Sequence, residues 1–194
     1  MDRIAQIIKN SASLNALNRQ INEILKLRDR SPEGKELWST ACKRFREAFD
    51  DLFFPGGVAI LLKVGAFDSS AIQAAIDFLV ADPVHFRSGY IKEDLWRKVP
   101  KWTLSDNDRD RIEKAALSYL DKQIRRDFWY MCRAMARIGT PSFWQQVEQR
   151  LCSENALIVK RASYLFAYSQ GLNPGEQLRR QVHYEVLRKK YGEN

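Results

Sequence analysis

Three arginines and a tyrosine share one side of a helix that the sequence predicts from Asp127 to Ile138. With this helix extended back by one turn, a step of 100° per residue places the other three side chains within about 40° of the first. The four residues are Arg126, Tyr130, Arg133 and Arg137. Guanidinium groups form paired hydrogen bonds with carboxylates and phosphates, and a tyrosine ring offers a stacking surface. The pattern predicts a face that binds an anionic partner, which Lys160 and Arg161 of a later helix could extend.

The opposite side of the same helix is apolar and is expected to face the core. Its residues are Phe128, Met131, Cys132, Met135 and Ile138. An arginine stripe opposite a core stripe is also what an ordinary solvated helix shows, and Arg161 could simply hydrogen-bond a turn between helices. The near absence of acidic residues from the stripe favours the binding role.

Three alternating aspartates resemble a calcium-binding loop without completing it. Asp106, Asp108 and Asp110 have the right spacing, but Arg111 stands where such a loop needs glycine. Leu117 stands where the loop needs glutamate. The three carboxylates are instead typical of a helix N-terminus, whose dipole they stabilise.

The histidines, cysteines and glycines predict no metal, cofactor or catalytic site. Neither His85 nor His183, the only histidines, has a second histidine or a cysteine at ligand spacing. The three cysteines are widely separated, which favours buried thiols over disulfides. Gly56 and Gly57 precede an apolar helix without the lysine and hydroxyl residue of a phosphate-binding loop. The sequence therefore favours a protein that is not an enzyme.

The net charge of +8 is concentrated toward the C-terminus. Residues 1–54 carry 10 basic and 8 acidic side chains, residues 55–110 carry 7 and 8, and residues 111–194 carry 15 and 8. The excess is therefore +2, −1 and +7. A basic surplus attracts anionic partners. We expect the partner to be an acidic protein or a nucleic acid.

No feature of the sequence predicts export or a membrane segment. The longest uninterrupted apolar run, Val58 to Leu62, is far shorter than the roughly 20 residues that cross a bilayer. The N-terminus begins Met1-Asp2 and lacks the apolar stretch of a signal peptide. We therefore expect a cytoplasmic protein that does not contact a membrane.

Apolar residues recur at helical intervals almost throughout, and alternating strand patterns are essentially absent. The first helix is predicted from about Ser13 to Asp29. A second begins at Ser31-Pro32, an N-cap followed by the residue best tolerated at the first helical position, and ends at Pro55. A short apolar helix over residues 58–64 completes an N-terminal segment, residues 1–66.

From Asp68 onward the pattern changes to three pairs of helices, over residues 68–99, 104–139 and 140–171. Their lengths of 32, 36 and 32 residues are typical of helical solenoids. A C-terminal helix is predicted over residues 174–194. We expect one all-helical domain over residues 1–194, with the pairs stacked as an α-α superhelix. An irregular α-helical bundle is the alternative.

The stretch from Asn155 to Ala162 resembles the start of the second helix of a HEAT repeat, where a small polar residue precedes an apolar-basic-alanine pattern. The resemblance covers roughly residues 104–171. It implies a non-enzymatic interaction module, because helical-repeat surfaces serve mainly as scaffolds, and the basic surface would bind an acidic protein segment.

Nucleic-acid binding by the same basic surface is the alternative function. The chain is also similar to small HEAT-like DNA glycosylases in fold class and basic charge. Their catalytic residues match no positions here, so this activity is a third hypothesis that rests on fold analogy alone.

Overall fold

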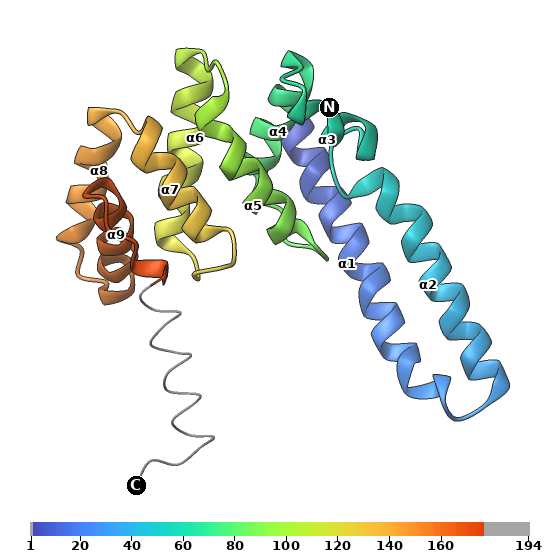
Figure 1. The fold of residues 1–194 in the computed structure, drawn as a ribbon. Helices are drawn as coiled ribbons and strands as arrows, with labels where there is room; N and C mark the ends of the chain where they lie inside the picture. The colour runs from blue at the N-terminus through green and yellow to red at the C-terminus, as the bar shows by residue number, and fades with distance from the viewer. Residues whose placement is uncertain (1, 177–194) are drawn as a thin grey trace, which may run out of the picture. The chain divides into compact units, whose positions relative to one another are not determined.

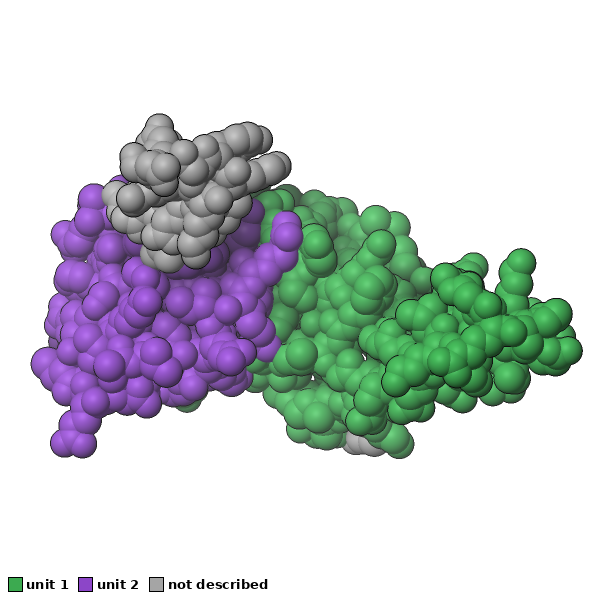
Figure 2. All heavy atoms as spheres, turned by 90° about the horizontal axis from the view of Figure 1, so that it is seen from below, with its two compact units in different colours: residues 1–115 green, residues 116–194 purple. Residues whose placement is uncertain are grey.

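The structure is a computed structural model, and it describes residues 2–176. These residues form α-helices and short 3-10 turns without a strand, so the predicted all-α fold is confirmed. The chain divides into two compact units, residues 1–115 and residues 116–194 (Figure 2). Most of the predicted C-terminal helix, with its five basic residues, lies outside the described residues.

Unit 1 begins with two long helices, α1 (Arg3–Arg28) and α2 (Pro32–Leu52), which lie side by side as an antiparallel hairpin (Figure 1). Both α1 and α3 pack against α4. The helices that follow the hairpin are α3 (Gly57–Gly65), α4 (Ser69–Ala81), α5 (Ser88–Lys98), the 3-10 turn η1 (Val99–Lys101) and α6 (Asp106–Ser118). The unit boundary after Ala115 falls within α6 and so divides the predicted pair 104–139.

Helix α1 begins ten residues earlier than predicted, at Arg3 instead of Ser13. The Asp2 side chain accepts a hydrogen bond from the backbone N–H of Ile4 and so caps the helix. Ile7 and Leu14, two turns apart, are both buried against the rest of unit 1. The early start therefore follows from a cap and an apolar face that the prediction overlooked.

Gly34 allows the closest approach within the α1–α2 hairpin. A Cβ atom added at this glycine would lie 2.1 Å from the backbone oxygen of Leu27 on α1. The N-cap Ser31 stands three residues earlier and accepts a hydrogen bond from the Gly34 N–H through its hydroxyl. The first turn of α2 therefore packs directly against the α1 backbone, where only glycine fits.

Substituting Gly34 with alanine is expected to lower the free energy of unfolding by about 1 to 3 kcal/mol, because the added methyl group forces the two helices apart. Urea unfolding followed by circular dichroism measures the change. Gly89→Ala is the matched control, because a Cβ there meets no atom within 4 Å. This control should be neutral or stabilising by up to about 1 kcal/mol. Equal stability of the two variants would contradict the close approach at Gly34.

Aromatic rings connect α2 to the segment after α4 in the core of unit 1. Phe49 stacks on Phe53 with ring centroids 5.0 Å apart, and its ring edge also approaches His85 at 6.4 Å. The His85 ring Nδ1 lies 2.9 Å from the backbone oxygen of Phe86. Burial lowers the pKa of His85, and the positive charge of Lys92 acts in the same direction.

Unit 1 is expected to lose stability as the pH falls below about 6.5, the ordinary pKa of histidine. His85 has a lowered pKa in the folded protein, so the unfolded chain takes up its proton more readily. Neutral His85 therefore contributes to the stability of unit 1 at a pH above the pKa that this histidine has in the unfolded chain. That contribution is lost as the pH falls through the pKa of His85 in the folded protein. Between pH 7 and pH 5 the urea midpoint of the wild type should fall further than that of His85→Phe. Parallel falls would contradict this role of His85.

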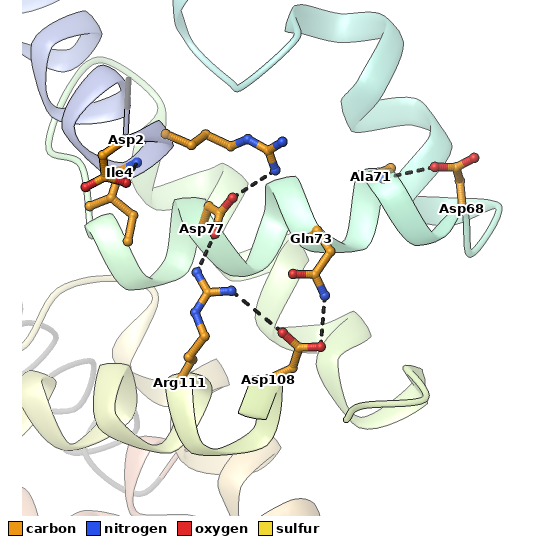
Figure 3. Close-up of polar contacts among 9 residues, drawn as sticks. Asp2, Ile4, Asp68, Ala71, Gln73, Asp77, Asp108 and Arg111 are labelled. Atoms are coloured by element: carbon orange, nitrogen blue, oxygen red, sulfur yellow. Dashed lines mark hydrogen bonds and ion pairs between the residues drawn. The ribbon is translucent and has the colours of Figure 1, made fainter. Parts of the chain in front are cut away.

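A network of charged side chains joins α1, α4 and α6 within unit 1 (Figure 3). The Asp77 carboxylate of α4 accepts from Arg3 at 2.9 Å and from Arg111 of α6. Asp108 accepts from Gln73 of α4 at 2.8 Å and lies 3.6 Å from Arg111. One of the three alternating aspartates, Asp108, thus joins α6 to α4, and the Ser105 hydroxyl accepts a hydrogen bond from the Asp108 N–H at the start of the helix.

Unit 2 contains the 3-10 turn η2 (Tyr119–Asp121) and the helices α7 (Phe128–Ile138), α8 (Pro141–Leu151) and α9 (Ala156–Ser169). Helices α8 and α9 lie side by side, and α7 also packs along α9. Side chains with no exposed surface fill the space between these helices. They are Phe128, Met131, Cys132, Met135, Phe143, Val147, Ala162 and Leu165.

Within residues 2–176, no helix is by itself both long enough and apolar enough to span a membrane. Helices α3 and α4 meet that length and composition only when taken together, and the chain bends by 107° between them.

Candidate functional site

Helix α7 has the two opposite faces that the sequence predicted. Met131, Cys132 and Met135 are fully buried on one side. Burial raises the pKa of the Cys132 thiol well above its ordinary value, so this group packs as a neutral apolar side chain. On the other side Arg133 is half-buried and Arg137 is exposed.

Arg126 does not belong to the helix, contrary to the prediction that α7 extends back by one turn. The helix begins at Phe128, and Asp127 precedes it as the N-cap residue. The buried Asp127 carboxylate accepts a 2.6 Å hydrogen bond from the Tyr119 hydroxyl of η2. The chain turns at Arg126 and Asp127, so helical periodicity no longer determines where Arg126 points.

Arg133 contacts two tyrosine rings. Its guanidinium carbon is 5.3 Å from the ring centre of Tyr130, on the same helix, and 5.9 Å from that of Tyr168 on α9. A cation over an aromatic face is attracted by the ring's electron density. Burial raises the pKa of Tyr168, and the positive charge of Arg133 acts in the opposite direction. The arginine is therefore positioned by side chains from two helices.

Helix α9 brings a second cation and further rings to the same region. Lys160 is exposed, and its amine lies 6.0 Å from the ring centre of Tyr164. The Trp129 ring of α7 lies 5.4 Å from that of Tyr164 and 6.5 Å from that of Tyr168. We call this region the α7/α9 face and define it by Tyr130, Arg133, Arg137, Lys160, Tyr164 and Tyr168.

The contacts between α7 and α9 also give their relative direction. Trp129 contacts Tyr164 and Arg133 contacts Tyr168, so each contact joins residues 35 positions apart (164 − 129 and 168 − 133). The contact advances along both helices in the same sense, so α7 and α9 run parallel. Between them in sequence, α8 packs against α9 as the other helix of the predicted pair 140–171.

Arg161 is buried in unit 2 and does not contribute a free guanidinium to the α7/α9 face. Only 8% of the residue is exposed, and its Nη1 donates to the backbone oxygen of Lys122, directly after η2. This is the alternative that the sequence left open, in which Arg161 hydrogen-bonds a turn between helices. The residue fixes α9 against η2.

The cations of the α7/α9 face have no acidic partner among residues 2–176. No carboxylate in this range pairs with Arg133, Arg137 or Lys160. Among residues 2–115, by contrast, basic side chains such as those of Lys92 and Arg111 form ion pairs with carboxylates. Within residues 116–176 there are 8 basic and 5 acidic residues, so the described part of unit 2 has an excess of +3.

Comparison with known proteins does not identify a relative. No protein-family model, curated protein or solved structure matches this chain. The case for a functional site therefore rests on the geometry and charge of the α7/α9 face.

A cavity in unit 1 is a weaker candidate for a binding site. It has a volume of about 360 Å³ and lies between the start of α1, the Pro55–Gly56 turn and α4. Its apolar lining includes Ile7 and Ile60, and its one cationic lining residue is Arg3. Because Arg3 already binds Asp77, the cavity offers no unpaired charge to a ligand.

Sequence reasoning missed the tyrosines and the tryptophan through which α9 and α7 surround Arg133. Tyr164 and Tyr168 are four residues apart on α9, and Trp129 is 35 residues before Tyr164. The 35-residue offset that places Arg133 opposite Tyr168 comes from the contacts between the helices and not from the predicted repeat lengths of 32, 36 and 32 residues. The position of these rings therefore requires the helix pairing to be known.

Proposed function

We propose that this protein is a non-enzymatic helical-repeat interaction module that binds an acidic protein segment through the α7/α9 face. The observation that carries the proposal is Arg133, whose guanidinium group lies over two tyrosine rings and pairs with no carboxylate among residues 2–176. Arg137 and Lys160 provide two further exposed positive charges.

The composition of the face favours a protein partner. Arginine and tyrosine are enriched where proteins bind one another, because each combines apolar contact area with hydrogen-bonding groups. The arginine fork matches the two oxygens of a carboxylate. An acidic helix or tail therefore fits both the charge and the chemistry of the surface.

The arrangement of α7, α8 and α9 supports a helical repeat. Helices α7 and α9 run parallel, and the residues that contact each other between them are 35 positions apart in the sequence. Helix α8 packs against α9. In a solenoid, equivalent helices of successive units stack in the same direction and line one surface. On this proposal the α7/α9 face is part of such a surface.

Affinity capture with and without nuclease tests the proposal. The native protein serves as bait beside Arg133→Glu/Arg137→Glu and beside a matched control, Arg44→Glu/Arg46→Glu. The control makes the same charge change at two exposed residues of α2. An acidic protein partner should remain after digestion with the wild type and the control and should be lost with the first variant. Equal capture by all three baits would contradict the proposal.

Nucleic-acid binding is the second candidate, favoured by the tyrosine rings that lie beside the cations of the face. Half-buried Tyr130 and Tyr164 could stack against bases while Arg133 and Lys160 contact phosphates. For a polynucleotide, log affinity should fall with log salt at roughly 0.7 to 0.9 per phosphate contact. Reversing Arg133 and Arg137 should reduce that slope by about two. An acidic protein should show a weaker salt dependence because it lacks condensed counterions.

A further inference from the structure

We infer that Arg133 is the anchor residue of the α7/α9 face, held by Tyr130 and Tyr168 so that the edge of its guanidinium group takes a carboxylate of the partner. This inference rests on the proposed function and adds to it which residue dominates binding and which residues position it. Tyr130 and Tyr168 act through Arg133 as positioning residues.

Tyr168 is fixed in place by the segment that follows α9. Only 8% of the residue is exposed, and its hydroxyl forms a 2.7 Å hydrogen bond with Oδ1 of Asn173. Gly175 lies so close that an added Cβ would come within 2.8 Å of the Trp129 ring and 3.0 Å of the Tyr168 hydroxyl. A ring held from this many sides has little freedom to move away from Arg133.

The second ring belongs to the same helix as the arginine. Tyr130 precedes Arg133 by three residues, a spacing that places the two side chains next to each other on the helix surface. Arg133 is therefore restrained by one ring that α7 itself provides and by another from α9. Restraining a long side chain before binding reduces the conformational entropy lost when the partner binds.

The guanidinium group of Arg133 keeps donors for a ligand. It carries five N–H groups, and no carboxylate among residues 2–176 pairs with it. A carboxylate accepts two such donors as a bidentate pair. Arg137 differs, because among residues 2–176 no ring and no carboxylate lies against it. Its guanidinium group contributes a positive charge, but no neighbouring side chain in this range fixes the orientation of that group.

Charge-conserving substitutions separate an anchor from a simple positive charge. The probe is a fluorescein-labelled peptide of twelve glutamates, titrated at 50 mM salt and followed by fluorescence anisotropy. Arg133→Lys should weaken binding about tenfold, because lysine keeps the charge but loses the fork. Arg137→Lys should weaken it less than about threefold. Arg44→Lys, outside the face, serves as the unchanged control.

Substitutions of Tyr168 test the positioning role without changing any charge. Tyr168→Leu should weaken peptide binding about fivefold, because the guanidinium loses one of its rings. Tyr168→Phe keeps the ring and should restore most of the affinity. The Nε–Hε resonance of Arg133 should be shifted upfield by the two rings in the free protein. That shift should be reduced in Tyr168→Leu and kept in Tyr168→Phe.

The outcomes distinguish this inference from the proposed function. If Arg133→Lys and Arg137→Lys bind the glutamate peptide equally well, Arg133 is not the anchor. The proposed function would still stand provided that charge reversal abolishes binding. If the wild-type protein binds a labelled twelve-nucleotide thymidine strand and not the glutamate peptide, both the carboxylate assignment and the acidic-protein proposal are wrong.

Discussion

Reversing the charges of Arg133 and Arg137 together is expected to lower the affinity for the acidic partner at least about 100-fold. The interaction of Arg133 with a carboxylate should contribute about 1.5 to 3 kcal/mol, and 1.4 kcal/mol corresponds to a factor of ten. Glutamate at both positions also adds repulsion toward the partner's carboxylates. Isothermal titration calorimetry on the captured partner measures the change.

The same double substitution should leave the fold intact. Arg137 is exposed, where substitutions change stability by less than about 0.5 kcal/mol. Arg133 loses its contacts with two tyrosine rings, each worth about 0.5 to 1 kcal/mol at such a site. Arg44→Glu/Arg46→Glu is the control for charge alone. Unchanged affinity in a folded Arg133→Glu/Arg137→Glu variant would show that these arginines are ordinary solvated surface residues without a role in binding.

Replacing Lys92 with alanine is expected to destabilise unit 1 by about 3 to 5 kcal/mol, because it leaves a buried carboxylate without its cation. The Lys92 amine lies 2.6 Å from the Asp82 carboxylate, and the side chains are 1% and 6% exposed. Lys98→Ala is the matched control. Its pair with Asp94 has the same 2.6 Å length but is 30% and 47% exposed, so its loss should cost less than about 1 kcal/mol.

A double substitution distinguishes two possible causes of the lost stability, the unpaired buried charge and the lost packing around Lys92. Lys92→Met with Asp82→Asn removes both charges and keeps similar volumes, and asparagine tolerates the positive φ of 46° at residue 82. This variant should recover a large part of the stability that Lys92→Ala loses. Urea unfolding of the three variants gives the comparison. If the double variant is as unstable as Lys92→Ala, the uncompensated charge is not the cause.

The helix boundaries that short local signals determine could be predicted from the sequence. Ser31 caps α2 through its hydroxyl, and Thr140 caps α8 in the same way. Gly171, with a φ of +75°, follows the end of α9, where glycine adopts the left-handed conformation without strain. Such signals depend only on neighbouring residues. The start of α1 was missed because its apolar face is short and is completed by packing against α4.

The candidate site could be predicted only in part, because periodicity describes one helix at a time. The spacing of Tyr130, Arg133 and Arg137 correctly placed them opposite the buried face of α7. The position of Tyr168 beside Arg133 depends on the packing of α9 against α7, which the pattern of neither helix contains. Arg161 is a second example, since its guanidinium group donates to the backbone oxygen of Lys122, 39 residues earlier in the sequence.

The central claim, that the α7/α9 face binds an acidic protein, is tested most directly by site-specific photocrosslinking. Arg137 is replaced by the photoreactive residue p-benzoylphenylalanine in cells, and the same replacement at Arg44 is the control. After nuclease digestion, mass spectrometry identifies what is joined to each position. We expect a crosslink at position 137, absent at position 44, to a peptide rich in aspartate and glutamate. A crosslink to nucleic acid, or the same products at both positions, would contradict it.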